Sequence, residues 1–359
     1  MDFVITIPAG PDFDPRMKLT LESLHIQKAK VKAALCDVSD DPKCHALIQS
    51  YEDLISYTRH GPDKGQSDAI NEGWRAVQGD IYGWLNVDDF LAPDALEIAE
   101  RIFTDNPDID VVYGQSLIME GKSFIGLHSE VRPITDDIYR SNIISQPSCF
   151  VRRSALFNVG LLDVDLHYTM DWDLWARLYE AGAKFHYVPE VLSVVAWEQT
   201  TKTASFNMQR YKELLRLPRR HAGRYAAQRT ALSFLLEHLS QYGFAKPVFK
   251  TLLRSIRKKN AVPDRRWRPV GTKADGGSNA QNIMCEVPLF HYEDSTDVTL
   301  ALGFTHAAKR QIEVGGEAPI THEKPHADID VRLSSGQAKI IRITSAQGHM
   351  SDLRSITWK

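Results

Sequence analysis

The stretch Gly79-Asp80-Ile81-Tyr82-Gly83-Trp84-Leu85-Asn86-Val87-Asp88-Asp89 decides the fold, because an apolar run of strand length ends there on two adjacent carboxylates. Buried parallel strands are near-continuous apolar runs, and open α/β sheets bind ligands at the carboxyl ends of their strands. We therefore expect Asp88 and Asp89 at a ligand-binding sheet edge. A divalent cation that also grips a diphosphate would relieve the repulsion between the two carboxylates. The alternative is that the pair only caps the helix expected after Pro93.

Strands and helices alternate on both sides of this stretch. Apolar or β-branched runs predict further strands at Phe3–Ile7, Val31–Cys36, Asp110–Gly114, Ile144–Val151 and Phe185–Val195. Helical spacing predicts helices over residues 17–27, 69–77 and 96–103, and another that begins at Met170. Because the two element types alternate along residues 1–201, we expect an α/β fold with a Rossmann-like, mostly parallel sheet flanked by helices.

The composition changes after residue 201. Residues 202–268 carry 17 basic and three acidic side chains, whereas residues 1–201 carry 17 basic and 32 acidic ones. The leucine pattern predicts two or three helices in the basic segment, with interruptions at Pro218 and Gly223. Residues 269–285 are expected to be a linker, and the alternating runs of residues 286–359 predict a small all-β domain resembling a sandwich.

Composition also limits the location and partners of the protein. The chain has no apolar run near the roughly 20 residues that span a bilayer, and its start lacks a secretory signature. Its four cysteines lie far apart without a Cys-x-x-Cys pair, which favours the cytoplasm and no structural zinc. The basic segment predicts peripheral binding to the anionic inner face of the membrane. The residues expected to face the lipid are Arg216, Arg219, Arg220, Arg224, Arg254, Arg257, Lys258 and Lys259. The alternative is that this segment docks onto the acidic residues 1–201. Nucleic acid is not expected as a partner, because the segment lacks interleaved aromatic residues.

Three more segments place polar residues next to expected strands or at the start of a helix. Asp37 follows the second strand, where a carboxylate either contacts a nucleotide or caps the next helix. In the turn-rich loop 60–68, Gly65 allows the backbone to approach a ligand and Lys64 supplies a positive charge. Asp171 and Asp173 lie in the first turn of a helix, where the dipole favours negative charge. Either they serve only that placement, with the neighbouring tryptophans in the core, or one of them is a catalytic base kept ionised by the dipole.

Four segments, in this order, resemble the family 2 glycosyltransferases, whose catalytic domain has the GT-A fold. They are Asp63-Lys64-Gly65-Gln66-Ser67-Asp68-Ala69-Ile70-Asn71, Gly83-Trp84-Leu85-Asn86-Val87-Asp88-Asp89, Gln146-Pro147 through Arg152-Arg153, and Met170-Asp171-Trp172-Asp173-Leu174-Trp175. The resemblance covers residues 1–201 and does not extend to residues 269–359.

The resemblance implies a role for each motif residue. A nucleotide-sugar donor would be bound by Pro8, Asp37, Asp63, Lys64, Gly65, Asp68, Asn71, Asn86 and Asp88. Asp89 would reach a divalent metal ion, Mn²⁺ or Mg²⁺, and Asp171 would be the general base. Gln146, Trp172 and Asp173 would line the acceptor or sugar pocket. Met170 stands where the family usually has Glu, and no His follows the last strand, so the resemblance assigns no third metal ligand.

The implied activity is metal-dependent, inverting transfer of a sugar to a hydroxyl of a glycan or lipid-linked acceptor in polysaccharide biosynthesis. A sugar nucleotidyltransferase is the enzymatic alternative, but it normally has a Gly-rich loop with Arg after the first strand. A catalytically inactive glycan-binding or scaffold protein is the other alternative, against which the joint presence of Asp88, Asp89 and Asp171 speaks. Association of copies through the C-terminal β domain is left open.

Overall fold

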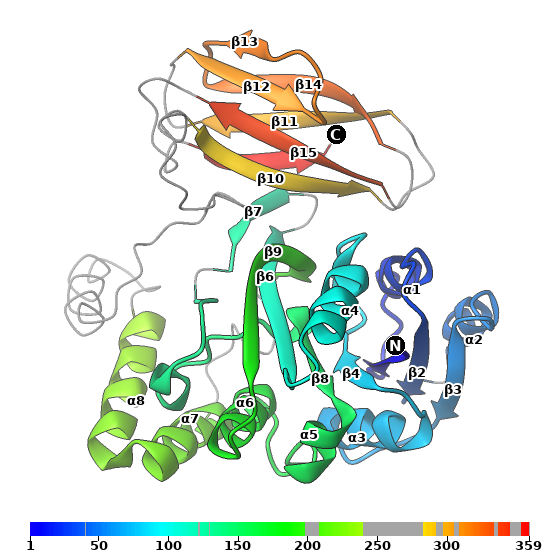
Figure 1. Ribbon diagram of the computed structural model, residues 1–359, viewed down its shortest axis with the longest axis vertical. Helices are drawn as coiled ribbons and strands as arrows, with labels where there is room; N and C mark the ends of the chain where they lie inside the picture. Colours follow the sequence, from blue (N-terminus) through cyan, green and yellow to red (C-terminus); the bar gives the residue numbers. More distant parts are fainter. Residues whose placement is uncertain are drawn as a thin grey trace.

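The computed structural model describes residues 1–39, 41–120, 123–128, 130–197, 208–239, 283–291, 297–304, 309–333, 337–344 and 353–358 (Figure 1). The strands up to residue 197 are β1 (Phe3–Ala9), β2 (Val31–Asp37), β3 (Ile55–His60), β4 (Ile81–Trp84), β5 (Phe90–Leu91), β6 (Val111–Glu120), β7 (Ser123–Leu127), β8 (Cys149–Arg152) and β9 (Phe185–Ala196). The helices are α1 (Met17–His25), α2 (Pro42–Gln49), α3 (Gln66–Ala76), α4 (Ala95–Asp105), α5 (Arg153–Asn158) and α6 (Met170–Glu180), with 3-10 turns η1 (Asp136–Tyr139) and η2 (Gln146–Ser148).

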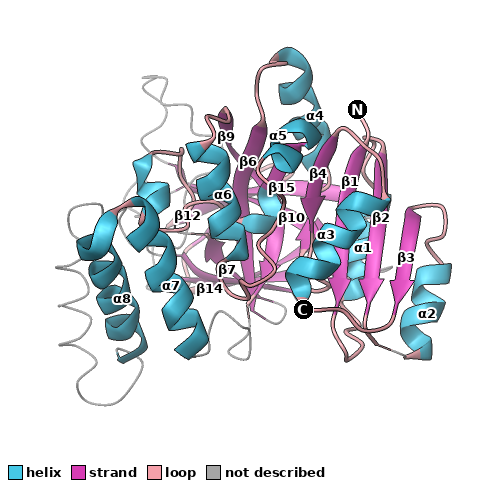
Figure 2. Ribbon diagram, turned by 90° about the horizontal axis from the view of Figure 1, so that it is seen from below, coloured by secondary structure: helices cyan, strands magenta, loops and turns pink. Residues whose placement is uncertain are grey.

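These strands form one mixed sheet with helices on both faces. Its order runs β7-β6-β8-β4-β1-β2-β3, with β9 paired to β5 and β6. The strands β1 to β4 are parallel to one another, whereas β8 is antiparallel to both β4 and β6. In Figure 2 the parallel strands lie side by side, with α2 at their outer end. The carboxyl ends of β1, β2 and β4 therefore meet at one edge of the sheet.

Strand β1 shows why this sheet lies between two layers of helices. Its residues from Phe3 to Ile7 are at most 1% exposed. Phe3 belongs to the same core cluster as Leu21 of α1, and its neighbour Val4 belongs to a second cluster with Trp74 of α3. Because both faces of the strand are covered, its sequence is apolar throughout rather than alternating.

A column of tryptophans joins β4 to α3 and α6. Trp84, the last residue of β4, stacks on Trp175 of α6 with ring centroids 5.7 Å apart, and Trp74 of α3 meets it edge-on at 5.5 Å. The indole N–H of Trp74 donates to the carbonyl oxygen of Gly83 at 3.0 Å. These contacts fix both helices against the strand that carries the acidic pair.

Several elements differ from the sequence predictions. The strand predicted over Gly79–Asp89 is shorter in the structure, where β4 ends at Trp84 and a turn follows. The strand predicted over Ile144–Val151 is replaced in its first half by η2, and β8 runs antiparallel to its neighbours. Strand β3 and helix α2 were not predicted. The acidic pair still follows β4 directly, so the shorter strand leaves its position at the sheet edge unchanged.

The chain continues into helices α7 (Met208–His221) and α8 (Gly223–Leu239), which lie on the opposite side of the domain from β3 and α2 (Figures 1 and 2). The predicted break at Gly223 is present, with φ +84°, whereas Pro218 lies inside α7. Arg254, Arg257, Lys258 and Lys259 lie outside the described residues. Among the residues that are described, no helix is both long enough and apolar enough to cross a bilayer.

The C-terminal strands are β10 (Ile283–His291), β11 (Asp297–Phe304), β12 (Arg310–Val314), β13 (Ile320–His322), β14 (His326–Arg332), β15 (Gln337–Thr344) and β16 (Leu353–Trp358). One sheet has the order β10-β15-β12-β13, and the strands β14-β11-β16 form another row. Leu300 and Ile329 of this row share a core cluster with Ile341 of the other sheet, as expected for a sandwich. Strand β16 also pairs with β7, so the second row continues the α/β sheet (Figure 1).

Candidate active site

The turn after β4 presents the two carboxylates. Asp89 is 4% exposed, and the side chain of Asp88 is 23% exposed. One oxygen of Asp89 accepts from the Asn86 side-chain amide at 2.9 Å, and the other accepts from the backbone N–H of Ala196 at 3.3 Å. Both oxygens of Asp89 thus face protein donors, whereas Asp88 is the more accessible acid.

Three elements hold this turn from different sides. The hydroxyl of Thr20, in α1, lies 2.9 and 2.8 Å from the carbonyl oxygens of Val87 and Asp89. The side-chain amide of Gln66, at the start of α3, donates to Asn86 Oδ1 at 2.6 Å. Ala196 at the end of β9 supplies the third contact. The turn is therefore positioned before any ligand binds.

The local charges favour a cation at the turn. Burial first, and the neighbouring charge of Asp88 second, raise the pKa of Asp89 well above its usual range. Arg16 approaches Asp88 at 3.8 Å but is also paired with Asp14 at 2.6 Å. A divalent cation would remove the electrostatic cost of two adjacent carboxylates, and carboxylate oxygens are the ligands that Mg²⁺ and Mn²⁺ prefer.

The loop before α3 is built around Gly65. Its φ of +117° is open to glycine and strained for other residues, and its backbone N–H donates to Asp63 Oδ1 at 2.8 Å. Asp63 also pairs with Arg59 at 3.1 Å. Lys64 is exposed, and its backbone N–H approaches Asp68 Oδ2 at 3.2 Å. The start of α3 thus has an exposed lysine beside a glycine turn, and this combination suits an anion.

Asp37 ends β2, where the parallel register pairs it with Ala9 of β1 and places Pro8 opposite Cys36, and it is fully buried. Its Oδ1 accepts from the backbone N–H of Ser39 at 2.8 Å, and its Oδ2 lies 3.2 Å from Nδ1 of His60. The Cys44 thiol also hydrogen-bonds to it, and burial together with this carboxylate raises the pKa of that thiol to about 12. Asp37 is therefore held rigidly at the edge where the donor was expected.

Asp171 is the second residue of α6, whose first turn contacts α3. Burial raises its pKa above the usual aspartate value, and this outweighs the opposite influence expected from the helix dipole. Its Oδ2 accepts from the side-chain amide of Asn142 at 2.8 Å. The preceding residue, Met170, accepts through its sulfur from the hydroxyl of Ser67 at 2.9 Å. This contact joins the first turns of α3 and α6.

Gln146 links the same region to β4. Its side-chain amide donates to the carbonyl oxygen of Trp84 at 2.6 Å. Asn142 contacts Asp171, and Gln146 contacts the end of β4. Because these two residues are four positions apart, their Cα atoms are at most about 14 Å from each other. The structure thus brings the acidic turn, the loop of α3 and Asp171 to the same edge of the sheet.

Three of the expected site residues make hydrogen bonds or ion pairs within the fold. Asn71 is 1% exposed, and its amide exchanges two hydrogen bonds, of 2.9 and 3.0 Å, with the backbone of Leu162. The buried indole of Trp172 donates to the carbonyl oxygen of Ile138. Asp173 pairs with Arg177 at 2.7 Å and is buried. Their polar atoms have partners within the fold, which gives each a structural role, and the donor-binding and pocket roles expected for them stay predictions.

Sequence reasoning missed two residues that position Asp171. One is Asn142, for which the sequence carries no signal. The other is Glu213 of α7, a buried carboxylate that accepts from the backbone N–H groups of His167, Tyr168 and Thr169 at 3.1, 2.8 and 3.1 Å. Glu213 is one of three acidic residues in the basic segment, and that rarity was an available signal.

The comparisons with known proteins agree with this geometry. Residues 16–164 match the family model described as glycosyl transferase family 2. Residues 16–164 of this chain are therefore similar to the family 2 glycosyltransferases. An uncharacterized glycosyltransferase of Rickettsia typhi is 27% identical over 230 residues, covering 60% of this chain and 70% of that protein. A similar protein of Rickettsia prowazekii is 28% identical over 231 residues, with the same coverage. The resemblance inferred from the four motifs is confirmed.

Solved structures confirm the fold of this glycosyltransferase. Residues 1–349 of S. aureus TarS, solved with UDP-GlcNAc, match with a TM-score of 0.52 at 15% identity, over 72% of this chain and 81% of that one. A longer TarS structure covers 96% of this chain and 72% of its own length, with a TM-score of 0.51 at 11% identity. The predicted GT-A sheet and the α/β class are confirmed.

Proposed function

We propose that this glycosyltransferase moves a sugar, with inversion, from a nucleoside-diphosphate donor to a hydroxyl of a glycan or lipid-linked acceptor. The observation that carries the proposal is the convergence of an acidic turn, an anion-suited helix start and the half-buried carboxylate of Asp171 at one sheet edge. The UDP-GlcNAc in the TarS structure belongs to that protein and supports a sugar-nucleotide donor here.

The residues of the acidic turn fit a divalent cation, Mn²⁺ or Mg²⁺. When bound, such an ion would offset the negative charge of the diphosphate leaving group. We assign the metal contact to Asp88, because its carboxylate is accessible while both oxygens of Asp89 accept from Asn86 and Ala196. Asp89 then fixes the turn and adds its charge. This exchanges the two roles expected from the resemblance, in which Asp89 reached the metal.

The remaining groups bind and activate the substrates. Lys64, which is exposed just before α3, would bind the diphosphate, and the nucleoside would lie at the carboxyl end of β2, where Asp37 is located. Asp171 would accept the proton of the acceptor hydroxyl as its oxygen forms a bond to the anomeric carbon. The bond from that carbon to the diphosphate breaks on the opposite side, so the configuration inverts. The raised pKa of Asp171 increases its basicity for this step.

The acceptor side of the proposal draws on two observations. Residues of this chain are 27% identical to part of the O-antigen biosynthesis protein RfbC of Myxococcus xanthus, over 49% of this chain and 12% of that protein, which supports surface polysaccharide as the product. Helices α7 and α8 carry exposed Arg219, Arg220 and Arg224 beside Tyr225, which is 81% exposed. A basic surface with an exposed aromatic residue suits the cytoplasmic face of an anionic membrane, where lipid-linked acceptors are found. Arg216, by contrast, pairs with Asp163 at 3.3 Å within the fold.

A donor screen tests the proposal directly. The purified full chain is incubated with a panel of sugar nucleotides, with and without Mn²⁺, and release of the nucleoside diphosphate is measured. We expect turnover of one donor class that requires the metal, and a loss of at least roughly 10²-fold in Asp171→Asn with donor binding retained. Asp173→Asn serves as a comparison outside the chemistry. Donor turnover that survives in Asp171→Asn would exclude Asp171 as the base.

A further inference from the structure

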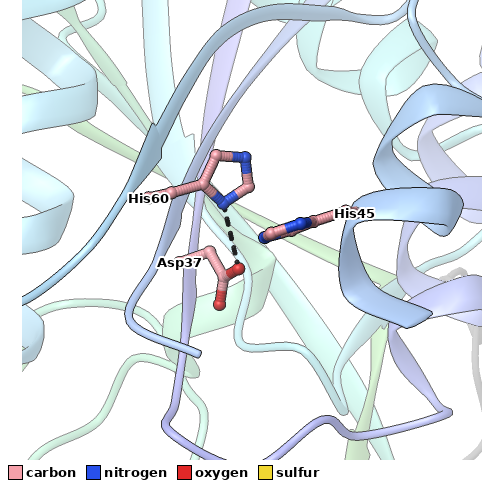
Figure 3. Close-up of side chains that lie close together, drawn as sticks. All are labelled: Asp37, His45 and His60. Carbon is pink, nitrogen blue, oxygen red and sulfur yellow. Dashed lines mark hydrogen bonds and ion pairs between the residues drawn. The ribbon is translucent and has the colours of Figure 1, made fainter. Parts of the chain in front are cut away.

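A second group of potential metal ligands lies apart from the acidic turn. Asp37 at the end of β2, His45 in α2 and His60 at the end of β3 each direct one ligand atom to a common point, and these atoms lie within 4.8 Å of one another. Figure 3 shows both imidazole rings turned toward the carboxylate. The His45 and His60 ring centroids are 4.3 Å apart.

Two features of this cluster point to an ion rather than to internal pairing. The Nε2 atom of His45 is buried and has no hydrogen-bond partner among the described residues, an arrangement that costs free energy unless a ligand fills it. Asp37 is fully buried, yet it lies beside His60, whose side chain is 43% exposed. The cluster is therefore preformed at its base and reachable by solvent at its rim.

The spacing suits a transition-metal ion. Zinc binds imidazole nitrogen and carboxylate oxygen at about 2.0–2.2 Å, so the edge of a tetrahedral site is about 3.4 Å. The distance from Nδ1 of His60 to Oδ2 of Asp37 is 3.2 Å, and an ion could replace this contact with little movement of either residue. His45 is carried by a short helix at the sheet edge and needs only a small shift to complete the site. We propose that Asp37, His45 and His60 bind a divalent transition-metal ion of the zinc type.

The ligand types separate this site from the acidic turn. Two imidazoles and one carboxylate favour Zn²⁺ over Mg²⁺, which prefers oxygen ligands alone. Asp37, His45 and His60 supply three ligands of a tetrahedral site. Water or an atom of a bound molecule would take the fourth position. The backbone N–H of Ser39 holds Oδ1 of Asp37, so the carboxylate keeps its orientation when the ion binds.

The experiment measures zinc binding by the full chain after treatment with chelator and desalting. Calorimetric titration with Zn²⁺ in excess Mg²⁺ is expected to give one ion per chain, and Co²⁺ substitution is expected to give the visible absorption of a tetrahedral centre. His45→Gln and His60→Gln should each weaken zinc binding by at least about tenfold. His25→Gln is the matched control, because His25 pairs with Asp53 at 3.6 Å in the same domain without a second histidine near it.

Two further measurements keep the result decisive. Thermal melting of each variant without metal establishes that the fold is retained, so that a weaker affinity reports the ligand itself. Asp89→Asn should bind zinc as the unaltered chain does, because the acidic turn is a different site. Undiminished binding in His45→Gln, equal loss in His25→Gln, or loss in Asp89→Asn would each overturn the proposal.

Discussion

Replacing Glu213 tests whether α7 holds the start of the helix that carries Asp171. Its Oε2 accepts from the backbone N–H groups of Tyr168 and Thr169, and its Oε1 accepts from that of His167. In Glu213→Gln one side-chain oxygen remains as an acceptor, and the other is replaced by an NH₂ group that cannot accept. At least one backbone N–H then loses its partner, at a cost of about 1–3 kcal/mol. If that cost falls on the ordered position of residues 167–170, the turnover number should drop about tenfold, since 1.4 kcal/mol is a factor of ten.

The assay separates positioning from a general loss of stability. Initial rates over a range of donor concentrations should show a lower kcat and little change in donor KM, because α3 is also held to the acidic turn through Gln66 and Asn86. Arg216→Gln, on the same helix, is the control, since its exposed pair with Asp163 contributes at most about 1 kcal/mol. An unchanged kcat in Glu213→Gln, or a change confined to donor KM, would refute the positioning role.

Four other predictions address the site and the surface. Asp88→Asn should abolish Mn²⁺-dependent turnover, whereas Asp89→Asn should retain a weakened metal response; the opposite ranking in a metal titration would restore Asp89 as the ligand. Because the folded-state pKa of Asp89 is raised, the metal-free chain binds protons more tightly when folded, so its melting temperature should fall as pH rises from about 4 through that pKa, and Mn²⁺ should recover it. The rate should decline as pH falls through the raised pKa of Asp171, and a pH profile without an acid limb would contradict this. Charge reversal at Arg219 and Arg220 should weaken salt-sensitive sedimentation with anionic vesicles, and equal behaviour with neutral vesicles would show that these charges do not bind lipid.

The sequence alone predicted the buried strands of the α/β sheet but not its edge strand, β3. Strands β1 and β2 and the first four residues of β6 are mostly buried and apolar, so composition alone located them. Strand β3 reads Ile55-Ser56-Tyr57-Thr58-Arg59-His60, and its partly exposed polar residues resemble a loop. The direction of β8 could not be predicted either, because an apolar run of four residues fits a parallel or an antiparallel neighbour equally well.

For the site, the sequence located the motifs but not the orientation of each side chain. The partner of Asn71 is Leu162, 91 residues away, so nothing local indicated that its amide was already committed. Asp171 and Asp173 have the same residue type in the same helical turn. What distinguishes them is that Asp173 has Arg177 four residues later on the same helix face. That spacing was visible in the sequence and should have favoured Asp171 more strongly.

Met170 has a consequence for how the base titrates. A glutamate at this position would place a second carboxylate beside Asp171, and two interacting acids lose their protons in coupled steps that belong to the pair. The thioether is uncharged, and it receives the Ser67 hydroxyl as a neutral acceptor. The other acid of the turn, Asp173, is neutralised by Arg177. Asp171 therefore takes up its proton as a single independent group, and the acid side of the rate profile should follow one ionisation with a slope of one.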